Sequence, residues 1–273
     1  MCLGYLQAGT DRRMESQAGL SIAPLRGMQL FGAGMSIASE IAAAITREGG
    51  GLRDGDVIVV AQKIVSKAEG RLVQLADVRA GPAARELAAK TGRTPQYAQL
   101  ILNESSEILR ETPAAIIARQ KSGHVLANAG IDASNVDGGG DGTVLLWPID
   151  PDASARALRA ELGAMCGVRP AVVIADSLGR AWRIGTVGAA IGCAGLSVLD
   201  DRRGKGQDLF GRTLQATVIA VADAAAAAAV LVMGEGAEGT PAALIRGAGQ
   251  WVTDEDGPGA ASGLRPVAED MFR

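Results

Sequence analysis

The chain has 273 residues, of which 48% are hydrophobic and 21% are charged, and its formal net charge is −3 at pH 7. This length allows one large domain or two smaller ones with a full hydrophobic core. Because Lys and Arg are scattered and the balance is slightly acidic, a basic nucleic-acid-binding surface is excluded, whereas a local group of arginines can still form an anion pocket.

Cysteine and histidine are too few for the common metal and redox sites. The three cysteines, Cys2, Cys166 and Cys193, are far apart and odd in number, so they form neither a disulfide framework nor a CxxC metal site. They indicate a reducing cytoplasm. The single histidine, His124, excludes a His-rich zinc site, and no GxSxG motif accompanies it. We therefore interpret His124 as a strand or turn residue rather than as part of a catalytic triad.

The N-terminal segment lacks the continuous apolar core of a signal peptide. We interpret residues 1–23 as a loose extension, with Met14 as an alternative first residue, and residues 24–273 as one domain. The longest apolar run, 216–233, consists mostly of alanine and is interrupted at Thr217 and Asp223. It predicts a buried helix rather than a membrane span.

The first elements in chain order are a helix and a strand. Ser36 can cap a helix that ends near residues 49–51, with isoleucines at helical spacing at 37, 41 and 45. Residues 54–56 then predict a turn, and Val57 to Val60 predict a strand. Three basic residues follow at four-residue spacing: Lys63, Lys67 and Arg71. They are suitable for phosphate contacts at a strand end. The alternative is a solvated basic face, and the spacing alone favours this second interpretation.

The middle of the chain predicts a helix followed by a hairpin. Thr94-Pro95 begins a helix that runs through Glu111, and residues 114–118 and 125–127 pair as strands around Lys121-Ser122-Gly123. The second strand runs into 128–136, NAGIDASNV, which is dense in Asn, Asp, Ser and Gly. Asp132 and Asn135 either point at one ligand from a turn or form only caps and Asx-turns. Residues 138–142 predict a flexible loop.

The remaining elements complete a mixed α/β pattern. Asp152 is predicted to cap a helix over 153–165. Residues 200–208 are predicted to form a charged loop, and residues 213–233 are predicted to be mostly an alanine-rich helix. Helices and strands interleave without a regular βαβ alternation, so we predict a mixed α/β fold and not a simple doubly wound sheet.

The densest chemistry lies in residues 172–192, VVIADSLGRAWRIGTVGAAIG. The apolar run at 172–174 predicts a buried strand that ends at Asp176, with Ser177 beside it. A carboxylate and a hydroxyl suit a hard cation such as Mg²⁺ that bridges phosphates, and Arg180 and Arg183 suit a grip on phosphate or carboxylate. The alternative is a surface turn with an Arg–Asp ion pair and Trp182 as core filler.

A second glycine-rich stretch, GEGAEG at 234–239, matches the dinucleotide-binding pattern literally, and Asp254 lies 20 residues after Gly234. That site requires a strand before the glycines and a helix after them, whereas an alanine-rich helix precedes them here and Pro241 follows. We interpret it as an acid-bearing loop able to carry phosphate or metal. Together these residues indicate a metal-assisted phosphate-handling enzyme, without choosing its substrate.

Several long motifs occur here in an order known from one family. They are GDVIVVAQKIVSKAEGR, ANAGIDASNV, DSLGRAWRIG followed by AIG, and the Asp223 helix leading to MGEGAEGTP. From about Gly27 to Arg273 the chain resembles the coenzyme F-420 gamma-glutamyl ligases (F420-0:L-glutamate ligases). The resemblance implies an irregular mixed-sheet fold, intertwined homodimers and a cytoplasmic enzyme acting on small molecules, with no nucleic acid or membrane partner.

The resemblance also implies a reaction. GTP would phosphorylate the phospholactyl carboxylate of a deazaflavin coenzyme precursor, F-420-0, and the amine of L-glutamate would attack the acyl phosphate. Further gamma-linked glutamates would follow. Two divalent ions, Mg²⁺ or Mn²⁺, would bridge the phosphates, and K⁺ is a further expected ion.

Site residues follow from the same motifs. The resemblance implies that Asp132 and Asp176 bind one divalent ion and that Ser177 and Glu235 bind a second. It implies nucleotide contacts from Lys67, Asn135, Gln62 and Lys63 (the last two on the preceding strand), from Gly234, Gly236, Ala237 and Glu238, and from Met28, Gln29, Leu30 and Phe31. Arg180 and Arg183 as catalytic anion clamps, beside Asp176, are our hypothesis from charge.

The chain departs from the family pattern near its N-terminus. Gly27-Met28-Gln29 stands where the family has Gly-Leu-Pro, residues 32–35 replace an acidic Gly-Asp stretch, and Ala181 replaces a proline. These changes leave the base preference and the acceptor open. The alternatives are a same-fold amide ligase for another carboxylate in a specialised pathway, a non-catalytic nucleotide-binding relative, and an NAD-dependent dehydrogenase that rests on GEGAEG alone.

Overall fold

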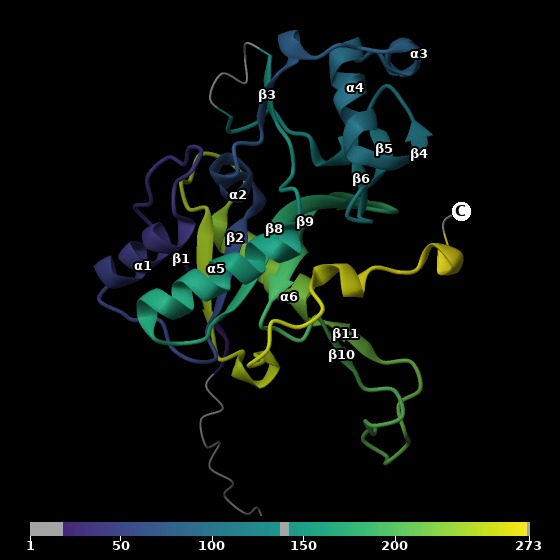
Figure 1. Ribbon diagram of the computed structural model, residues 1–273. Coiled ribbons are helices and arrows are strands. Elements are labelled where there is room, and N and C mark those ends of the chain that lie inside the picture. Colours follow the sequence, from purple (N-terminus) through teal and green to yellow (C-terminus); the bar gives the residue numbers. More distant parts are fainter. Residues whose placement is uncertain (1–18, 137–141, 272–273) are drawn as a thin grey trace, which may run out of the picture.

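The computed structural model describes residues 19–136 and 142–271, and within them the strands form four sheets (Figure 1). The central sheet has five strands, which in spatial order are β1 (Ser21–Pro24), β12 (Ala242–Arg246), β2 (Val57–Ala61), β8 (Ala171–Arg180) and β9 (Arg183–Ala194). Only β2 and β8 run parallel. The prediction of a mixed α/β fold that is not doubly wound is therefore confirmed.

Helices cover both faces of this sheet. On one face α1 (Ile37–Arg47) and α5 (Pro151–Cys166) pack against Ile58 and Val60 of β2. On the other face α6 (Val221–Met233) packs against Val57 and Val59. Because successive side chains of a strand point to opposite faces, burial on both sides requires the continuous apolar run seen in β2.

A second lobe with its own apolar core lies beside the central sheet, at the top of Figure 1. It contains α3 (Pro82–Thr91), α4 (Pro95–Glu104) and a sheet of β4 (Ser105–Glu111), β5 (Ile116–Gln120) and β6 (Val125–Ala127). The ribbon of β3 (Leu72–Gln74) and β7 (Thr143–Leu145) connects it to the central sheet, and α2 (Gln62–Ala68) follows β2 directly. Short 3-10 turns occupy Leu75–Asp77, Asn128–Gly130, Gly249–Trp251, Ala260–Gly263 and Val267–Glu269.

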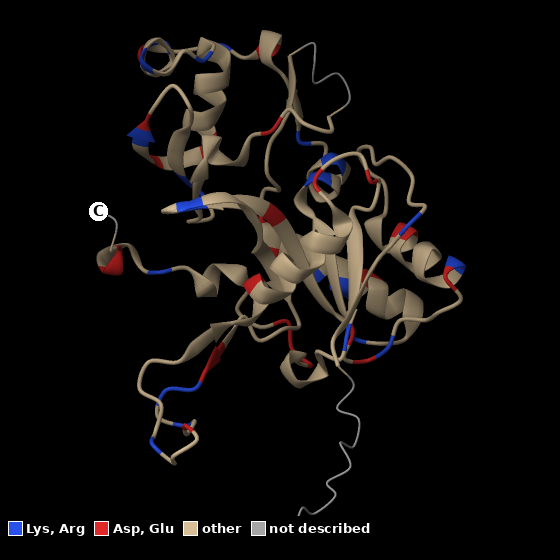
Figure 2. Cartoon of the chain, turned by 180° about the vertical axis from the view of Figure 1, so that it is seen from behind, with Lys and Arg blue, Asp and Glu red and all other residues tan. Residues whose placement is uncertain are grey.

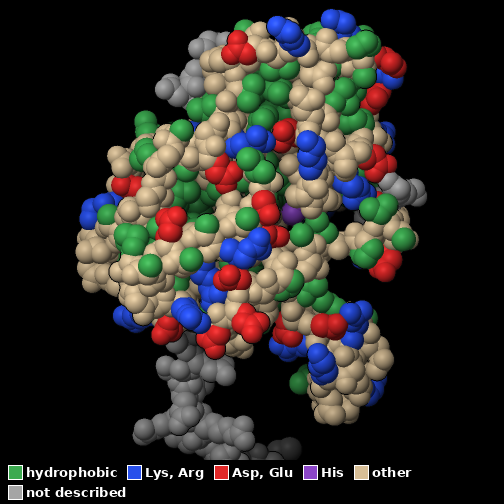
Figure 3. All heavy atoms as spheres, viewed as in Figure 1, with side chains coloured by type: hydrophobic (Ala, Val, Ile, Leu, Met, Phe, Trp, Pro, Cys, Tyr) green, Lys and Arg blue, Asp and Glu red, His purple; other side chains and the backbone are tan. Residues whose placement is uncertain are grey.

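An arm projects from the opposite end of the molecule (Figure 1). It starts and ends in the paired strands β10 (Leu199–Asp201) and β11 (Val218–Ala220). At its far end Leu209 and Phe210 are 99% and 82% exposed. Over the face seen in Figure 3, basic and acidic side chains alternate and do not gather into one basic patch.

Several predicted boundaries agree with the structure. Ser36 caps α1, where its side chain accepts a hydrogen bond from Ser39 N, and β5 and β6 form the predicted hairpin. The sheet begins at Ser21, inside the segment predicted to be a loose extension, and residues 1–18 lie outside the described part. Of the predicted loop 138–142, only Gly142 is described. No helix among the described residues is long and apolar enough to cross a membrane.

Two predicted helices were too long. The helix from Thr94 ends at Glu104, and residues 105–111 form β4, which pairs with β5. The helix predicted from Thr213 begins only at Val221, because residues 218–220 pair with β10 as β11. In both places strand pairing with a distant segment outweighs the local helical pattern.

The predicted cap of α5 was also wrong. Asp150, not Asp152, caps this helix and accepts a hydrogen bond from Ala153 N at 2.9 Å. Pro151 occupies the first helical position, which places the cap at Asp150, two residues before the predicted one. Asp152 instead accepts hydrogen bonds from Cys193 N and Ala260 N and so ties α5 to β9 and the C-terminal segment.

Candidate functional site

The candidate site lies where the two parallel strands separate. Pairing of β2 with β8 stops at Ala61 and Ala175, after which β2 continues into α2 and β8 continues with β9 as a hairpin. Asp176 and Ser177 follow at this point of separation. The prediction that the strand ends at Asp176 was wrong, because β8 keeps its second partner as far as Arg180.

Helix α2 supplies the lysines of the site. Gln62 and Lys63 were predicted on the strand, but they open α2, and Lys63 and Lys67 lie one turn apart on it. Gln62 is buried, and its Nε2 donates to Ser66 Oγ at 2.7 Å. The pattern that suggested a solvated basic face therefore places two ammonium groups beside the polar loop 132–135.

Asp132 is held by a lysine and by its own turn. Lys63 Nζ lies 2.5 Å from Asp132 Oδ2 and donates to Ser134 Oγ at 2.9 Å, while Ser134 N donates to Asp132 Oδ1 at 2.7 Å. Burial works to raise the pKa of Asp132, but the bonds from Lys63 and Ser134 outweigh it and hold the pKa below its usual value. Asp132 is therefore an anion positioned by a cation.

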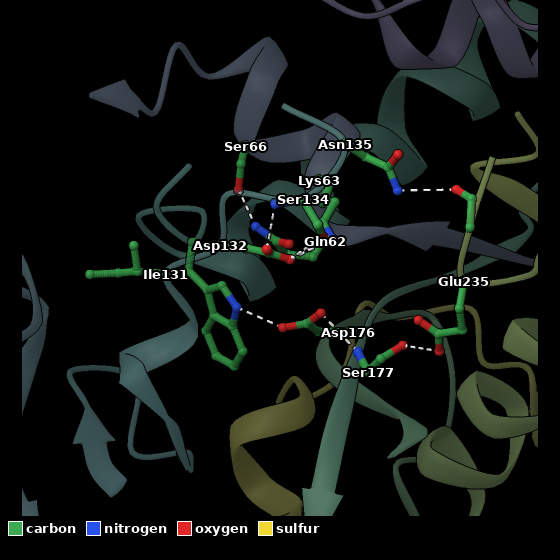
Figure 4. A network of polar contacts seen from close by, with 12 residues as sticks. Gln62, Lys63, Ser66, Ile131, Asp132, Ser134, Asn135, Asp176, Ser177 and Glu235 are labelled. Carbon is green, nitrogen blue, oxygen red and sulfur yellow. Dashed lines mark hydrogen bonds and ion pairs between the residues drawn. The ribbon is translucent and has the colours of Figure 1, made fainter. Parts of the chain in front are cut away.

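Asp176 has the opposite balance (Figure 4). Trp147 Nε1 donates to its Oδ2 and Ser177 N to its Oδ1, both at 2.8 Å. Burial nevertheless dominates these bonds and raises the pKa of Asp176 to about 6, and the neighbouring Asp132 contributes in the same direction. A cation placed between the two carboxylates would remove this penalty.

The third acid comes from the glycine-rich loop after α6. Ser177 Oγ donates to Glu235 Oε1 at 2.5 Å, which brings together the hydroxyl and carboxylate predicted as one ligand pair. In the same loop Gly236 N donates to Glu238 Oε2 at 2.7 Å. Gly234 has a positive φ of 79°, and a Cβ there would collide with the Glu238 carboxylate.

Hydrogen bonds join these three segments into one network (Figure 4). Lys67 Nζ donates to Asn135 O at 2.7 Å, and Asn135 Nδ2 donates to Gly236 O at 3.1 Å. Asn135 itself has a positive φ of 53°, a conformation that asparagine tolerates better than most residues. Ala237 lies exposed in the same loop. The structure therefore brings together the residues predicted from three distant motifs.

Segment 28–31 does not share this network within the described part of the chain. Gln29 Nε2 donates to Glu40 at 2.7 Å, Phe31 is buried in the core with α1, Met28 packs against that core and Leu30 is exposed. Its role as a nucleotide contact stays a prediction. However, Gly34 N donates to Ala68 O at 2.8 Å, so the chain just after it lies against the end of α2.

The two arginines lie away from the carboxylates, at the far end of the β8–β9 hairpin. Arg180 and Arg183 are paired across the turn, and Arg180 Nη2 donates to Ile184 O at 3.2 Å. Among the described residues neither guanidinium forms an ion pair, and Trp182 is 90% exposed. The alternative of an Arg–Asp pair with Trp182 as core filler was therefore wrong.

Trp147 is the site residue that the sequence did not reveal. It is completely buried beneath the site, and its only polar atom faces Asp176. Gly130, with a φ of 78°, allows this contact, because a Cβ there would collide with the indole. His124 packs edge-on against the same ring, 5.5 Å between centroids, and lies in the β5–β6 turn as predicted. Burial lowers the pKa of His124.

The donor chemistry fits a hard cation that is shared with a ligand. Among the described residues there is no group of three or more His, Cys, Asp or Glu side chains able to enclose an ion. Instead Ser177 and Glu235 are in contact, and the carboxylate of Asp132 is near enough to Asp176 to raise the pKa of Asp176. Mg²⁺ and Mn²⁺ accept such partial sets, since phosphate and water complete their coordination.

The dinucleotide alternative does not fit this geometry. The glycines at 234–239 follow α6 rather than a strand, and the next element is β12 rather than a helix. The crossover that a dinucleotide site requires, strand before and helix after, is therefore reversed here.

Comparisons with known proteins cover most of the chain. The family model described as F420-0:Gamma-glutamyl ligase matches residues 27–247, which include every residue of the network above. The coenzyme F420:L-glutamate ligase of Methanothermobacter thermautotrophicus is 46% identical over 255 residues, 93% of this chain and 99% of the relative. The enzymes of the same name from Methanopyrus kandleri and Archaeoglobus fulgidus are 44% and 42% identical, over 85% and 84% of this chain and 90% and 88% of theirs.

Proposed function

We propose a GTP- and metal-dependent mechanism for this chain, which belongs to the F420-0:gamma-glutamyl ligase family. Membership makes it an enzyme that ligates glutamate to a coenzyme F420 precursor. One observation supports the dependence on GTP and metal. Two lysines and the predicted metal ligands lie in one network of polar contacts: Lys63, Lys67, Asp132, Asp176 and the Ser177–Glu235 pair.

The proposed reaction has two steps. A carboxylate oxygen of the precursor attacks the γ-phosphorus of GTP, which forms an acyl phosphate and releases GDP. The amine of L-glutamate then attacks the acyl carbon and expels inorganic phosphate, and one amide bond forms. Asp132 with Asp176, and Ser177 with Glu235, would hold the divalent ions, whose charge would offset that of the phosphates.

The chain's own residues would orient the phosphates. Lys63 now neutralises Asp132 at 2.5 Å, and a cation bound by Asp132 would compete for the same oxygen. The ammonium group would then be free to turn toward a phosphate, one turn of helix from that of Lys67. Asn135 and the loop 234–238 are already bonded to each other and would close over the nucleotide.

Mass spectrometry tests this proposal directly. Incubation with GTP, Mg²⁺ or Mn²⁺, L-glutamate and F420-0 should give products spaced by one glutamyl residue, with release of GDP. Lys67→Met should raise the KM for GTP about 10- to 100-fold, since it removes a charge-assisted contact. Lys121→Met, on the exposed β5–β6 turn, is the matched control and should leave this KM unchanged. Product formation that is independent of nucleotide would contradict the mechanism.

A second candidate is an amide ligase of the same fold for another carboxylate. It is favoured by the position of residues 28–35, which depart from the family pattern and contact the end of α2 through Gly34. Tight metal-dependent GTP binding without glutamylation of F420-0, followed by turnover of another carboxylate, would select it.

We also propose that the chain acts as a homodimer. The support is the exposed apolar end of the arm, Leu209 and Phe210, because large apolar side chains at the end of a projecting ribbon are typical of contact surfaces.

A further inference from the structure

The β8–β9 hairpin continues well beyond the sheet that supports it. After Ala175 it loses the pairing with β2, and residues 179–186 are all exposed. Its strands are joined by the two-residue turn Ala181-Trp182 between the paired Arg180 and Arg183. The hairpin therefore presents an aromatic ring and two guanidinium groups on a projecting ribbon rooted at Asp176.

Trp182 occupies a backbone position that disfavours it. Its φ is +62°, in the left-handed region where a bulky residue is an outlier and where glycine is the usual choice in a tight turn. Its ring contributes little to a core, since it is 90% exposed. Strained residues of this kind collect at binding sites, so the outlier supports a binding role for the ring.

The charge of the hairpin is one-sided. No Asp or Glu occurs between Ser177 and Leu199, so Arg180 and Arg183 give this segment a charge of about +2 at pH 7. Figure 2 shows basic residues at the far end of the hairpin. Arg180 is braced across the turn by bonds to Ile184 O and Gly185 O at 3.2 and 3.5 Å. An anionic molecule that carries a planar ring complements these groups.

The length of the hairpin matches the acceptor. A strand rises about 3.3 Å per residue, which places Arg180 about 13 Å from Asp176, with Trp182 just beyond. In the F420 precursor about ten bonds, through a phosphodiester and a ribityl chain, separate the lactyl carboxylate from the deazaflavin ring, about 12 Å when extended. An acceptor whose carboxylate lies beside Asp176 and Ser177 therefore reaches the tip of the hairpin with its ring.

We propose that the β8–β9 hairpin is the acceptor-binding subsite, in which Trp182 stacks on the deazaflavin ring. This inference rests on the proposed function, because it takes the acyl acceptor of that reaction as its ligand. Trp182 is assigned to substrate binding and specificity and not to the bond-forming steps.

The decisive variant is Trp182→Gly. Glycine suits the positive φ, so the fold should be retained, whereas the stacking surface is lost. The KM for F420-0 should rise about 5- to 100-fold, as expected for loss of one stacking contact, while the KM for GTP should stay within about twofold. Trp182→Phe should restore most of the affinity. Met165→Gln, at an exposed apolar position near the end of α5 and outside the hairpin, is the control and should change neither constant.

Fluorescence supplies a readout that does not depend on turnover. Trp147 is buried and Trp251 is partly buried, so emission at long wavelength should come mainly from Trp182. F420-0 should quench the total tryptophan emission strongly in the wild type and only weakly in Trp182→Gly. A truncated acceptor with the phospholactyl group and no ring should bind both proteins equally.

Three results would overturn the subsite. The first is an unchanged KM for F420-0 in Trp182→Gly, and the second is equal quenching in both proteins. The third is dissociation of an oligomer in Trp182→Gly with equal losses for GTP and F420-0, which would make the hairpin an interface. If the wild type forms no glutamylated product, the proposed function fails, and the quenching experiment alone then decides whether the hairpin binds the ring.

Discussion

At the scale of single residues, the carboxylate of Asp176 is pulled in two directions. Hydrogen bonds from Trp147 and Ser177 favour its charged form, and burial disfavours it more strongly, so its pKa is about 6. A raised pKa is expected of a buried metal-binding carboxylate in the absence of its metal. A bound cation would stabilise the charged form of the carboxylate, which burial destabilises.

We predict that Asp176→Asn abolishes metal-dependent turnover and stabilises the metal-free protein at pH 7.5 by about 1–2 kcal/mol. The shift of the pKa from 3.8 to about 6 means that the charged carboxylate costs about 3 kcal/mol, which the asparagine variant avoids. The variant loses one of the two hydrogen bonds that Asp176 accepts, which reduces the gain by about 1 kcal/mol. Urea unfolding without metal measures the difference, and binding of Mn²⁺ in the presence of GDP measures the loss of the site.

The pH dependence of that difference follows from the sign of the shift. The pKa of Asp176 is higher in the folded protein than in the unfolded chain, so between about pH 4 and pH 6 the folded protein binds more protons. The stability of the wild type therefore falls as the pH rises from about 4 through about 6. The advantage of Asp176→Asn should therefore vanish below about pH 4. Destabilisation by this variant at pH 7.5, or a constant difference across the range, would contradict the assignment.

Trp147 should act as a positioning residue for the same carboxylate. Trp147→Phe removes the bond to Asp176 Oδ2 and keeps most of the packing with His124, so we expect about 10-fold weaker binding of Mn²⁺ and about 1–3 kcal/mol lower stability. Calorimetry with GDP measures the first and urea unfolding the second. Trp251→Phe, in the core on the α6 face, is the control and should leave metal binding unchanged. Equal metal affinity in both variants would remove Trp147 from the site.

At the scale of elements, glycines in β9 allow the helices to pack closely against this strand. A Cβ at Gly192 would collide with the backbone of Pro151 at the start of α5, whereas a Cβ at Gly179, in the projecting part of the hairpin, would meet nothing within 4 Å. Gly192 is therefore required for close packing of β9 against α5, whereas Gly179 is not required for packing.

We predict that Gly192→Ala destabilises the protein by about 3 kcal/mol, because the backbone of α5 must move away from the sheet. Gly179→Ala should change stability by less than about 1 kcal/mol, since it adds a methyl group to an exposed strand. Thermal unfolding of the two variants measures the contrast. Similar melting temperatures would show that α5 can shift freely.

Local sequence signals predicted some of these elements well. Ser36 and the isoleucines of α1 are sufficient because one amphipathic face and one cap determine a surface helix. Residues 105–111 were misassigned because their strand is stabilised by pairing with 116–120, which no local pattern contains. The position of Lys63 was missed for a related reason, since nothing in the apolar run marks where β2 gives way to α2.

The candidate site was predictable only through its motifs. Asp132, Asp176 and Glu235 come from segments far apart in the chain, and composition alone could not show that they converge. Trp147 was missed because a buried tryptophan after an apolar strand resembles core packing, and only the structure shows its indole N–H directed at Asp176.

At the scale of the whole molecule, the arm formed by residues 199–220 is the segment that projects farthest from the central sheet at its end of the molecule. It leaves the central sheet as the ribbon β10–β11, and ion pairs between neighbours, Arg203 with Asp201 and Arg212 with Asp208, brace it from within. Its end carries Leu209 and Phe210 in solvent. A ribbon of two short strands is marginally stable alone, so contact with a second surface would stabilise this conformation.

We predict that the double substitution Leu209→Ser with Phe210→Ser shifts the protein from dimer to monomer. Burial of the two side chains in a partner contributes about 2–3 kcal/mol each, and a dimer would lose this twice because the interface is symmetric. Light scattering across a dilution series measures the change, and Val267→Ser, another exposed apolar position on the C-terminal segment, is the control. A wild-type protein that is monomeric at micromolar concentration would contradict the prediction. A monomeric variant that still binds GTP but glutamylates F420-0 poorly would show that the acceptor subsite depends on the assembled dimer.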